Sequence, residues 1–288
     1  MKPPPFQYCR PADLSEALLC LNKYGSQARI LAGGQSLVPE MNFRKTCPQV
    51  LIDINAVESL KSVERDDDFL ILGAGLTQSE LARCKPMLEV CPIMKDVLDY
   101  VGYEQTRNRG TFGGSLAYGD PAGELPAMAM ALDAEFELKA HDRSRWVRAE
   151  AFYIGPFSTV IEPDEMLARI RIPLRRDAVL WAFAEQPVKT FGKAIAGVVT
   201  ALALDSGYTV SSARIVAWGV GDRPLRLNGV EAELDGSCLD DSVICAAVSK
   251  LQNELDPPGD IHASPALRKY LAGNLLRRSL QNLCSESL

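Results

Sequence analysis

The chain has 288 residues, of which 47% are hydrophobic and 24% are charged, a balance typical of a folded protein with one large or two medium-sized domains. Its formal net charge of -6, with no local run of Lys or Arg, excludes the basic surface that nucleic acid requires. The N-terminal stretch lacks the apolar segment of a signal peptide and later apolar runs are too short to span a bilayer, so we expect a cytoplasmic protein without a membrane span.

The first predicted elements are short and end at glycine-rich turns. Asp13 and Glu16 have the spacing of a capping box, an apolar stripe follows them, and Gly25 suits the end of the resulting helix. Ser36 is placed to cap a brief helix that has Pro39 in its first turn. The elements expected here are a helix over 13–24, a strand over 29–31, the brief helix after Ser36, and a strand over 50–54.

The middle of the chain mixes strands with helices. Thr77 and Glu80 repeat the capping-box spacing, which predicts a helix reaching about Arg83. Asp120-Pro121 resembles an N-cap and first-turn pair that opens another helix. The remaining elements expected are a helix over 88–101 and strands over 69–74, 134–140, 145–149 and 166–172.

Beyond Pro173 the pattern changes to longer strands followed by two helices. Strands are expected over 181–184, 194–204 and 213–220, and helices near 240–253 and 265–283, which together predict a sheet with helices on one face. The polar connector Arg175-Arg176-Asp177 suggests a domain boundary near 174–178. We therefore expect an α+β protein with one domain over 1–175, divided into subdomains of about 1–56 and 57–175, and a second over 176–288.

Two glycine-rich loops carry the main chemical signal: LAGGQSL at 31–37 and GTFGGSL at 110–116. Paired glycines let consecutive backbone N–H groups point into one anion-binding nest, and the missing Cβ lets a diphosphate approach the main chain. A nearby helix N-terminus favours the same anion. A tight turn is the better interpretation of either loop alone, but two loops of the same type favour a nucleotide cofactor.

Two common nucleotide-binding motifs do not fit these loops. Gly33, Gly34 and Asp53 have roughly the spacing of a classical dinucleotide fold, but the third glycine is missing. Pro39 and Pro48 leave too little helix to link parallel strands. Neither glycine pair leads to the Gly-Lys-Ser/Thr of a Walker A loop.

The sequence contains no motif for a metal site or for a catalytic site. None of its eight cysteines forms a C-x-x-C pair, and its two histidines, His141 and His262, lie in polar stretches where exposed side chains are expected. We therefore predict neither a zinc site nor an iron–sulfur cluster in this chain. Without a nucleophile elbow, a paired-carboxylate motif or a histidine relay, we predict no catalytic residue, and a bound cofactor must carry any redox chemistry.

Two strings closely resemble the FAD-binding signatures of a known family. They are AGGQSLVPEMNFR at 32–44 and TRNRGTFGGSLAYGDPAGELPAMAMALDA at 106–134, with further similarity at 165–174 and 264–280. The family comprises the medium, flavin-carrying subunits of the xanthine dehydrogenase and carbon monoxide dehydrogenase group of molybdenum hydroxylases. The resemblance implies a two-part FAD-binding domain of the vanillyl-alcohol-oxidase or PCMH type, followed by an α/β C-terminal domain.

The resemblance also implies partners. In that family a large subunit holds the molybdenum pterin cofactor and oxidises the substrate, and a small subunit holds two 2Fe–2S clusters. The medium subunit's FAD receives the electrons, and the usual assembly is a dimer of heterotrimers. Because the large subunit selects the substrate, N-heteroaromatic rings such as quinoline, aldehydes, carbon monoxide and aromatic acyl-CoA thioesters all stay open, as does the electron acceptor.

Carried over by position, the resemblance implies a set of FAD-binding residues. Residues 32–36 and 111–115 would cradle the diphosphate and ribityl chain mainly through backbone N–H groups. Asp120 would either accept hydrogen bonds from the adenosine ribose or cap a helix, with Glu124 in the same region. Leu167 would lie against the flavin. The full set is Leu31, Ala32, Gly33, Gly34, Gln35, Ser36, Leu37, Gly110, Thr111, Phe112, Gly113, Gly114, Ser115, Tyr118, Asp120, Glu124 and Leu167.

Two departures from the family pattern leave roles open. Members often have His-Ala before the Asp-Pro, where this chain has Tyr118-Gly119, so Tyr118 is either an aromatic lid or a packing residue. Relatives commonly carry Phe-x-Lys, an Arg and an Asp in the segment where this chain has Glu185, Lys189 and Lys193. Besides the electron-transfer subunit, a self-contained flavoenzyme and a redox-inactive nucleotide-binding protein are alternative hypotheses.

Overall fold

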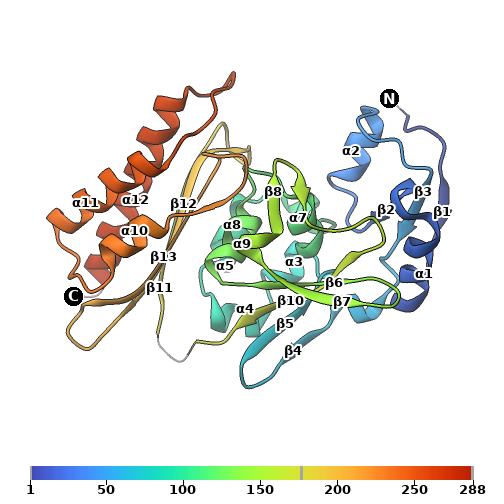
Figure 1. Ribbon diagram of the computed structural model, residues 1–288, viewed down its shortest axis with the longest axis horizontal. Helices are drawn as coiled ribbons and strands as arrows, with labels where there is room; N and C mark the ends of the chain where they lie inside the picture. The colour runs from blue at the N-terminus through green and yellow to red at the C-terminus, as the bar shows by residue number, and fades with distance from the viewer. Residues whose placement is uncertain (1, 176–177, 287–288) are drawn as a thin grey trace.

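The computed structural model describes residues 2–175 and 178–286, which form three lobes in chain order (Figure 1). The N-terminal lobe holds a parallel sheet of order β1-β3-β2 that packs on the helix α1. Asp13 caps α1 by accepting the N–H of Glu16, and Gly25 ends it with a φ of 48°, so the predicted helix is confirmed. The elements are β1 (Gln7–Cys9), α1 (Leu14–Tyr24), β2 (Ala28–Leu31), α2 (Leu37–Asn42) and β3 (Val50–Asp53), with 3-10 turns at Gly25–Gln27 and Glu58–Lys61.

The central lobe is built on an antiparallel sheet of order β4-β5-β10-β6-β7, surrounded by short helices. Its core gathers apolar side chains from the sheet and from the helices α3 to α5 and α7 to α9. The strands are β4 (Val63–Arg65), β5 (Phe69–Gly73), β6 (Glu135–Lys139), β7 (Ser144–Arg148) and β10 (Met166–Pro173), with a small pair β8 (Tyr153–Gly155) and β9 (Ser158–Thr159). The helices are α3 (Gln78–Leu81), α4 (Lys85–Val90), α5 (Met94–Tyr100), α6 (Glu104–Arg107), α7 (Phe112–Tyr118), α8 (Glu124–Ala131) and α9 (Ala149–Phe152).

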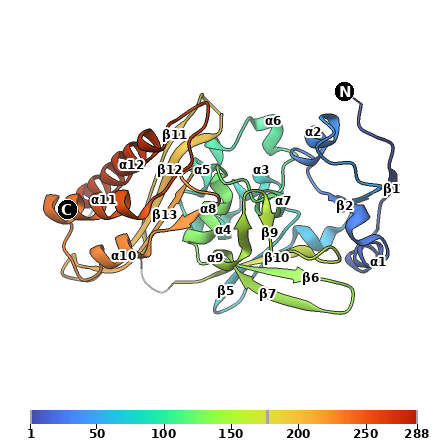
Figure 2. The ribbon, with the colours of Figure 1, turned by 45° about the horizontal axis from the view of Figure 1, so that its top comes forward.

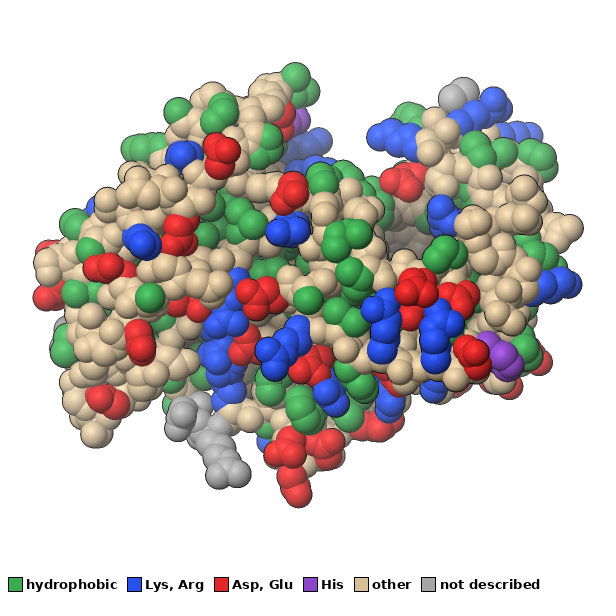
Figure 3. Space-filling model, viewed as in Figure 1, with side chains coloured by type: hydrophobic (Ala, Val, Ile, Leu, Met, Phe, Trp, Pro, Cys, Tyr) green, Lys and Arg blue, Asp and Glu red, His purple; other side chains and the backbone are tan. Residues whose placement is uncertain are grey.

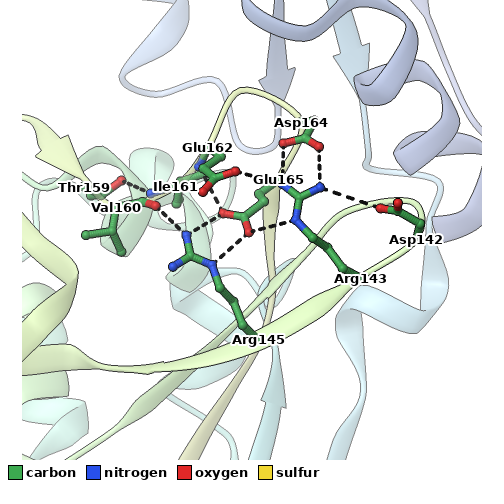
Figure 4. A network of polar contacts seen from close by, with 9 residues as sticks. All are labelled: Asp142, Arg143, Arg145, Thr159, Val160, Ile161, Glu162, Asp164 and Glu165. Carbon is green, nitrogen blue, oxygen red and sulfur yellow. Dashed lines mark hydrogen bonds and ion pairs between the residues drawn. The ribbon is translucent and has the colours of Figure 1, made fainter.

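An ion-pair network fastens the β6–β7 hairpin to the segment that precedes β10 (Figure 4). Arg143 donates to Asp164 at 2.8 and 2.9 Å and to Glu162 at 2.8 Å. Arg145 holds Glu165 through two hydrogen bonds of 2.9 and 2.8 Å. Bidentate guanidinium–carboxylate pairs fix geometry more firmly than single contacts. The network therefore holds the β6–β7 hairpin, at the edge of the sheet, against the segment that precedes β10.

The C-terminal lobe is an antiparallel sheet with helices on one face, as predicted, but with four strands and three helices where three and two were expected (Figures 1 and 2). Its other face packs on α8 of the central lobe, where Val199, Val216 and Trp218 join the central core. The elements are β11 (Leu180–Pro187), β12 (Ala194–Leu204), β13 (Val210–Trp218), β14 (Leu225–Arg226), α10 (Asn228–Leu234), α11 (Asp241–Glu254) and α12 (Pro265–Glu286). Of the predicted connector, Arg176 and Asp177 lie outside the described residues.

Two helix predictions were wrong, each for a local reason. The helix expected over 88–101 is two helices, because Pro92 follows the end of α4 and cannot continue the hydrogen-bond ladder. Asp120-Pro121 does not open a helix, because the Asp120 carboxylate accepts the N–H of Ala122 and its carbonyl accepts that of Gly123. This turn delays the start of α8 to Glu124.

Within the described ranges, no helix is long and apolar enough to cross a membrane. The same residues contain no group of three or more His, Cys, Asp and Glu side chains that is placed to hold a metal ion. Both histidines are exposed, as predicted.

Candidate cofactor site

The two glycine-rich loops touch one another at Gly33. A Cβ on Gly33 would lie 2.1 Å from the carbonyl oxygen of Arg109 and 2.7 Å from the Cα of Gly110. Gly113 is similarly confined, because a Cβ there would lie 2.6 Å from the carbonyl oxygen of Ala74. At both positions the missing side chain makes room for neighbouring backbone, and the approach of a diphosphate to these glycines stays a prediction.

The first loop leaves its backbone donors open. Within the described part of the chain, no group accepts a hydrogen bond from the N–H of any residue from Ala32 to Leu37. Its carbonyls are used instead: Asn55 donates to Ala32 at 2.9 Å, and the Gln35 side chain to Gly33 at 3.1 Å. Gly34 has a φ of 73°, the left-handed turn that glycine adopts most readily. These six successive N–H groups are therefore available to an anion, the kind of ligand that successive backbone donors bind.

The second loop already uses its backbone donors. The N–H groups of Phe112 and Gly113 donate to the carbonyls of Leu76 and Ala74 at 2.8 and 3.0 Å. Gly110 and Ser115 also donate within the chain, at 2.7 and 3.1 Å. The N–H groups of residues 112–115 therefore already have acceptors within the chain, while diphosphate binding by residues 111–115 stays a prediction.

The second loop also carries two hydroxyl groups, on Thr111 and Ser115, that bear on the candidate site. Thr111 caps α7 by accepting the N–H of Gly114 at 3.0 Å. The Ser115 oxygen accepts the side-chain amide of Gln78 at 2.8 Å, which leaves the hydroxyl hydrogen of Ser115 free to donate. Gln78 is buried and fixes the orientation of the Ser115 hydroxyl. The sequence analysis did not single out Gln78, and its position after Thr77, the cap of α3, is the one signal that could have found it.

A cavity of about 160 Å³ lies where the loops meet. It is lined by residues from both loops and from the 118–126 segment: Ser36, Val101, Ser115, Tyr118, Asp120, Gly123, Glu124, Leu125 and Pro126. Figure 3 shows the surface hollowed between the N-terminal lobe and the rest of the molecule. Phe112 and Leu167 lie in the central core and line no part of this cavity.

A larger cavity of about 460 Å³ begins one residue away, at Tyr100. Tyr100 and Asp99 form one side of it, and the turn between β11 and β12 forms the other with Val188, Lys189 and Phe191. This larger hollow combines apolar residues such as Val188 and Phe191 with polar ones such as Asp99 and Lys189, whereas residues of both glycine-rich loops line the smaller one. We place the candidate anion site at the smaller cavity, because Ser36 of the first loop and Ser115 of the second both line it.

Several carboxylates surround the smaller cavity. Tyr118 donates its hydroxyl to Glu40 of α2 at 3.0 Å, and burial together with this hydrogen bond raises the pKa of Tyr118. Its ring packs on Phe157 with centroids 5.0 Å apart, so Tyr118 both packs and joins two lobes. Lys193 Nζ lies 2.9 Å from the Asp120 carboxylate, a contact across 73 residues that no sequence pattern indicated.

The residues present fit FAD. Its diphosphate needs converging donors, and the open N–H groups of residues 32–37 with the Ser36 and Ser115 hydroxyls supply them. Its ring system needs an apolar wall, and Tyr100, Val188 and Phe191 supply one nearby. The site and the three-lobed fold together define a flavin-binding protein.

Comparison with known proteins gives the family. Residues 4–175 match the family model described as "FAD binding domain in molybdopterin dehydrogenase", and residues 182–283 match "CO dehydrogenase flavoprotein C-terminal domain". The chain belongs to this family, the FAD-binding medium subunits of molybdenum hydroxylases, which are oxidoreductases of several subunits.

Individual relatives match this chain over nearly its full length. The chain is 33% identical to the 6-hydroxypseudooxynicotine dehydrogenase complex subunit alpha of Paenarthrobacter nicotinovorans, covering 97% of this chain and 95% of that one. A carbon monoxide dehydrogenase structure from Hydrogenophaga pseudoflava matches with a TM-score of 0.95, 32% identity and 99% coverage of both chains. Quinoline 2-oxidoreductase from Pseudomonas putida 86 matches with a TM-score of 0.94 and 32% identity, covering 100% of this chain and 99% of that one.

Proposed function

We propose that this chain binds FAD across the junction of its N-terminal and central lobes. The observation that carries the proposal is the run of six open N–H groups from Ala32 to Leu37, in a loop that rests on the second loop at Gly33. Ser36 and Ser115 would add hydroxyl donors to the diphosphate. Gly110 to Gly114 would act mainly as the rigid support on which the first loop rests.

The remaining assigned residues have distinct proposed roles. Asp120 would accept hydrogen bonds from the ribose, with Lys193 neutralising its charge. Tyr118 and Glu124 would complete the polar wall. The Leu31 side chain packs against Gly34, and Leu37 is the first residue of α2. Both residues would therefore hold the first loop in position. Leu167 and Phe112 would contribute through the core behind the site. We propose domain bounds of 1–175 and 176–288.

We further propose that the bound FAD passes electrons between partner subunits and an external acceptor. FAD supplies the redox chemistry, and this chain binds and orients it. The partners would be a large molybdenum subunit and a small subunit with two 2Fe–2S clusters, in a dimer of heterotrimers. The names of the relatives support this assembly, since they include medium chains and lettered subunits of dehydrogenase complexes.

A cofactor and subunit inventory tests this proposal. The complex would be purified from its native host, its flavin identified by spectrum and mass, its molybdenum and iron measured, and its chains separated on a denaturing gel. FAD with molybdenum, iron and two further chains is the expected result. A flavin-loaded chain without partners would support a self-contained flavoenzyme instead, and a complex without flavin would overturn the proposal.

A further inference from the structure

Asn55 of the N-terminal lobe holds the first glycine-rich loop from outside it. Its side-chain nitrogen donates to the carbonyl of Ala32 at 2.9 Å, across 23 residues of sequence. The contact forms because β3, which ends two residues before Asn55, pairs with β2, which ends one residue before Ala32 (Figure 1). No motif in the sequence marked Asn55, and it lines neither of the two cavities.

The Asn55 side chain is itself held by Asp53, the last residue of β3. One carboxylate oxygen of Asp53 accepts the backbone N–H of Asn55 at 2.9 Å and its side-chain amide at 2.6 Å. The other oxygen accepts the hydroxyl of Tyr8 from β1. Burial raises the pKa of Asp53, but the hydrogen bonds from Tyr8 and Asn55 outweigh burial and hold that pKa below its usual value. Asp53 is therefore an ionised acceptor at neutral pH.

The two neighbours of the Asn55 amide determine its orientation. A carboxylate and a backbone carbonyl have no hydrogen to donate, so the NH2 group of Asn55, rather than its oxygen, must face both of them. One of its hydrogens serves Asp53 and the other serves Ala32. A substitution that keeps the size of this side chain but removes its hydrogens would therefore break both bonds.

The bond to the Ala32 carbonyl sets the direction of the next N–H group. The peptide between Ala32 and Gly33 is trans, and in a trans peptide the carbonyl and the N–H point in opposite directions. With the Ala32 oxygen held by Asn55, the Gly33 N–H points away from Asn55, where no acceptor among the described residues meets it. Because glycine has the widest choice of backbone conformation, this peptide would turn readily if the bond were lost.

The neighbouring peptides are held in the same way. Each of the four consecutive carbonyls from Leu31 to Gly34 accepts a hydrogen bond from the chain. Besides Asn55, the donors are the backbone N–H groups of Ile54 and Val38, each at 3.1 Å, and the side chain of Gln35, also at 3.1 Å. Of these four donors, Asn55 is the one side chain that comes from outside the loop.

We propose that Asn55 is a positioning residue for the FAD diphosphate: it keeps the Gly33 N–H of the cofactor-free chain turned in the direction that the diphosphate requires. The inference rests on the proposed FAD-binding function. Asn55 acts through the loop rather than on FAD, because its amide hydrogens are already used. A loop that is ordered before binding loses less entropy when the ligand arrives, so the effect is one on affinity.

The first test measures FAD affinity of the full-length chain by flavin fluorescence, for Asn55→Ala and Asp53→Ala singly and together. Loss of one hydrogen bond between neutral groups corresponds to a change of about two- to tenfold in a dissociation constant, and we expect a loss of that size in each single variant. The double variant should bind FAD no more weakly than Asn55→Ala, because Asp53 acts through Asn55. Urea denaturation checks that every variant is folded.

Asn55→Asp gives a readout that a purely structural role would not produce. The ionised carboxylate would repel both Asp53 and the Ala32 carbonyl, so FAD affinity at pH 8 should fall further than in Asn55→Ala. Because the charge of Asp53 disfavours a second one beside it, the new carboxyl should take up a proton as the pH is lowered to 5, and it then donates again. Relative to the natural chain, the FAD affinity of Asn55→Asp should recover across this range, while that of Asn55→Ala stays constant.

Asn22, an exposed asparagine of α1 in the same lobe, provides the matched control. Asn22→Ala and Asn22→Asp should bind FAD like the natural chain at every pH. Three results would overturn the positioning role while leaving FAD binding intact: an unchanged affinity in Asn55→Ala, an effect of Asp53→Ala that adds in full to that of Asn55→Ala, or a relative affinity of Asn55→Asp that does not change with pH. A natural chain that binds no FAD would instead overturn the proposed function.

Discussion

The two glycine-rich loops share a Gly-Gly pair followed by Ser-Leu but have different structural roles. In LAGGQSL the N–H groups from Ala32 to Leu37 lack partners within the described residues, whereas in GTFGGSL those from Phe112 to Ser115 are all bonded within the chain. The first glycine of each pair is held against backbone, Gly33 at Arg109 and Gly113 at Ala74. The likeness of the two strings therefore reflects shared packing more than shared ligand contacts.

The second glycine of each pair accounts for the difference. Gly34 takes a φ of 73°, which turns the chain and delays α2 until Leu37, so the intervening N–H groups stay open. Gly114 lies inside α7, which begins directly after the capping residue Thr111, so its N–H is satisfied at once. One loop provides the donors and the other provides the surface on which that loop rests.

The largest effect is expected from Gly33→Ala. The new methyl would meet the Arg109 carbonyl at 2.1 Å, and since both partners are backbone, the loops must separate. We expect loss of FAD binding and a fall of about 1–3 kcal/mol or more in the free energy of unfolding. Flavin content and urea denaturation would measure both. Gly155→Ala, where a Cβ meets nothing within 4 Å, should change neither.

The second largest effect is expected from Gly34→Val, which distinguishes a loss of FAD affinity from a loss of stability. A branched side chain disfavours the left-handed conformation by about 1–2 kcal/mol, and relief of that strain would turn the N–H groups away from the anion. Because a hydrogen bond to a charged group contributes about 1.5–3 kcal/mol, we expect FAD affinity to fall about tenfold or more. Gly236→Val, with a φ of 72° in the C-terminal lobe, should cause similar strain with unchanged FAD affinity. Equal FAD loss in both variants would contradict the assignment of the first loop.

Thr111→Val tests whether the second loop acts mainly as a support for the first. It removes the cap on the Gly114 N–H, which should cost about 1 kcal/mol in the free energy of unfolding. FAD affinity should fall less than in Gly34→Val, because no open donor of the first loop is lost. Thr111→Ser keeps the cap and should restore stability. If Thr111→Val reduced FAD affinity more than Gly34→Val, the division of roles between the loops would be wrong.

The smallest effect is expected from Lys193→Ala. The Lys193 side chain is 66% exposed, so its ion pair with Asp120 should contribute at most about 1 kcal/mol to stability. FAD affinity should weaken a few-fold at low ionic strength and recover in high salt, where exposed charges are screened. Lys61→Ala, which removes an exposed ion pair with Glu58, serves as the control. A salt-independent loss of affinity would argue against the electrostatic role.

Local signals in the sequence predicted much of the fold. The strand over 194–204 was predicted to the residue, because a long apolar run has few alternatives. Capping residues located α1 and α3 equally well. Short elements such as β1, β8, β9 and α10 were not predicted, because two to seven residues carry too little periodicity to stand out.

The candidate site was predicted only at the level of its motifs. Which N–H groups stay open depends on carbonyls at Ala74 and Leu76, distant in sequence from both loops. Lys193 reaches the site from the C-terminal lobe through Asp120, a contact that only the folded chain creates. Turn geometry at Asp120 likewise overrode its helix-capping pattern.

Amide hydrogen exchange of the full-length chain, with and without FAD, tests the division of roles most directly. The N–H groups of Ala32 to Leu37 should exchange rapidly in the cofactor-free chain and become protected when FAD binds. Those of Phe112 to Ser115 should be protected in both states, because their bonds lie within the fold. New protection confined to Phe112 to Ser115, with Ala32 to Leu37 unchanged by FAD, would contradict the assignment of the diphosphate to the first loop.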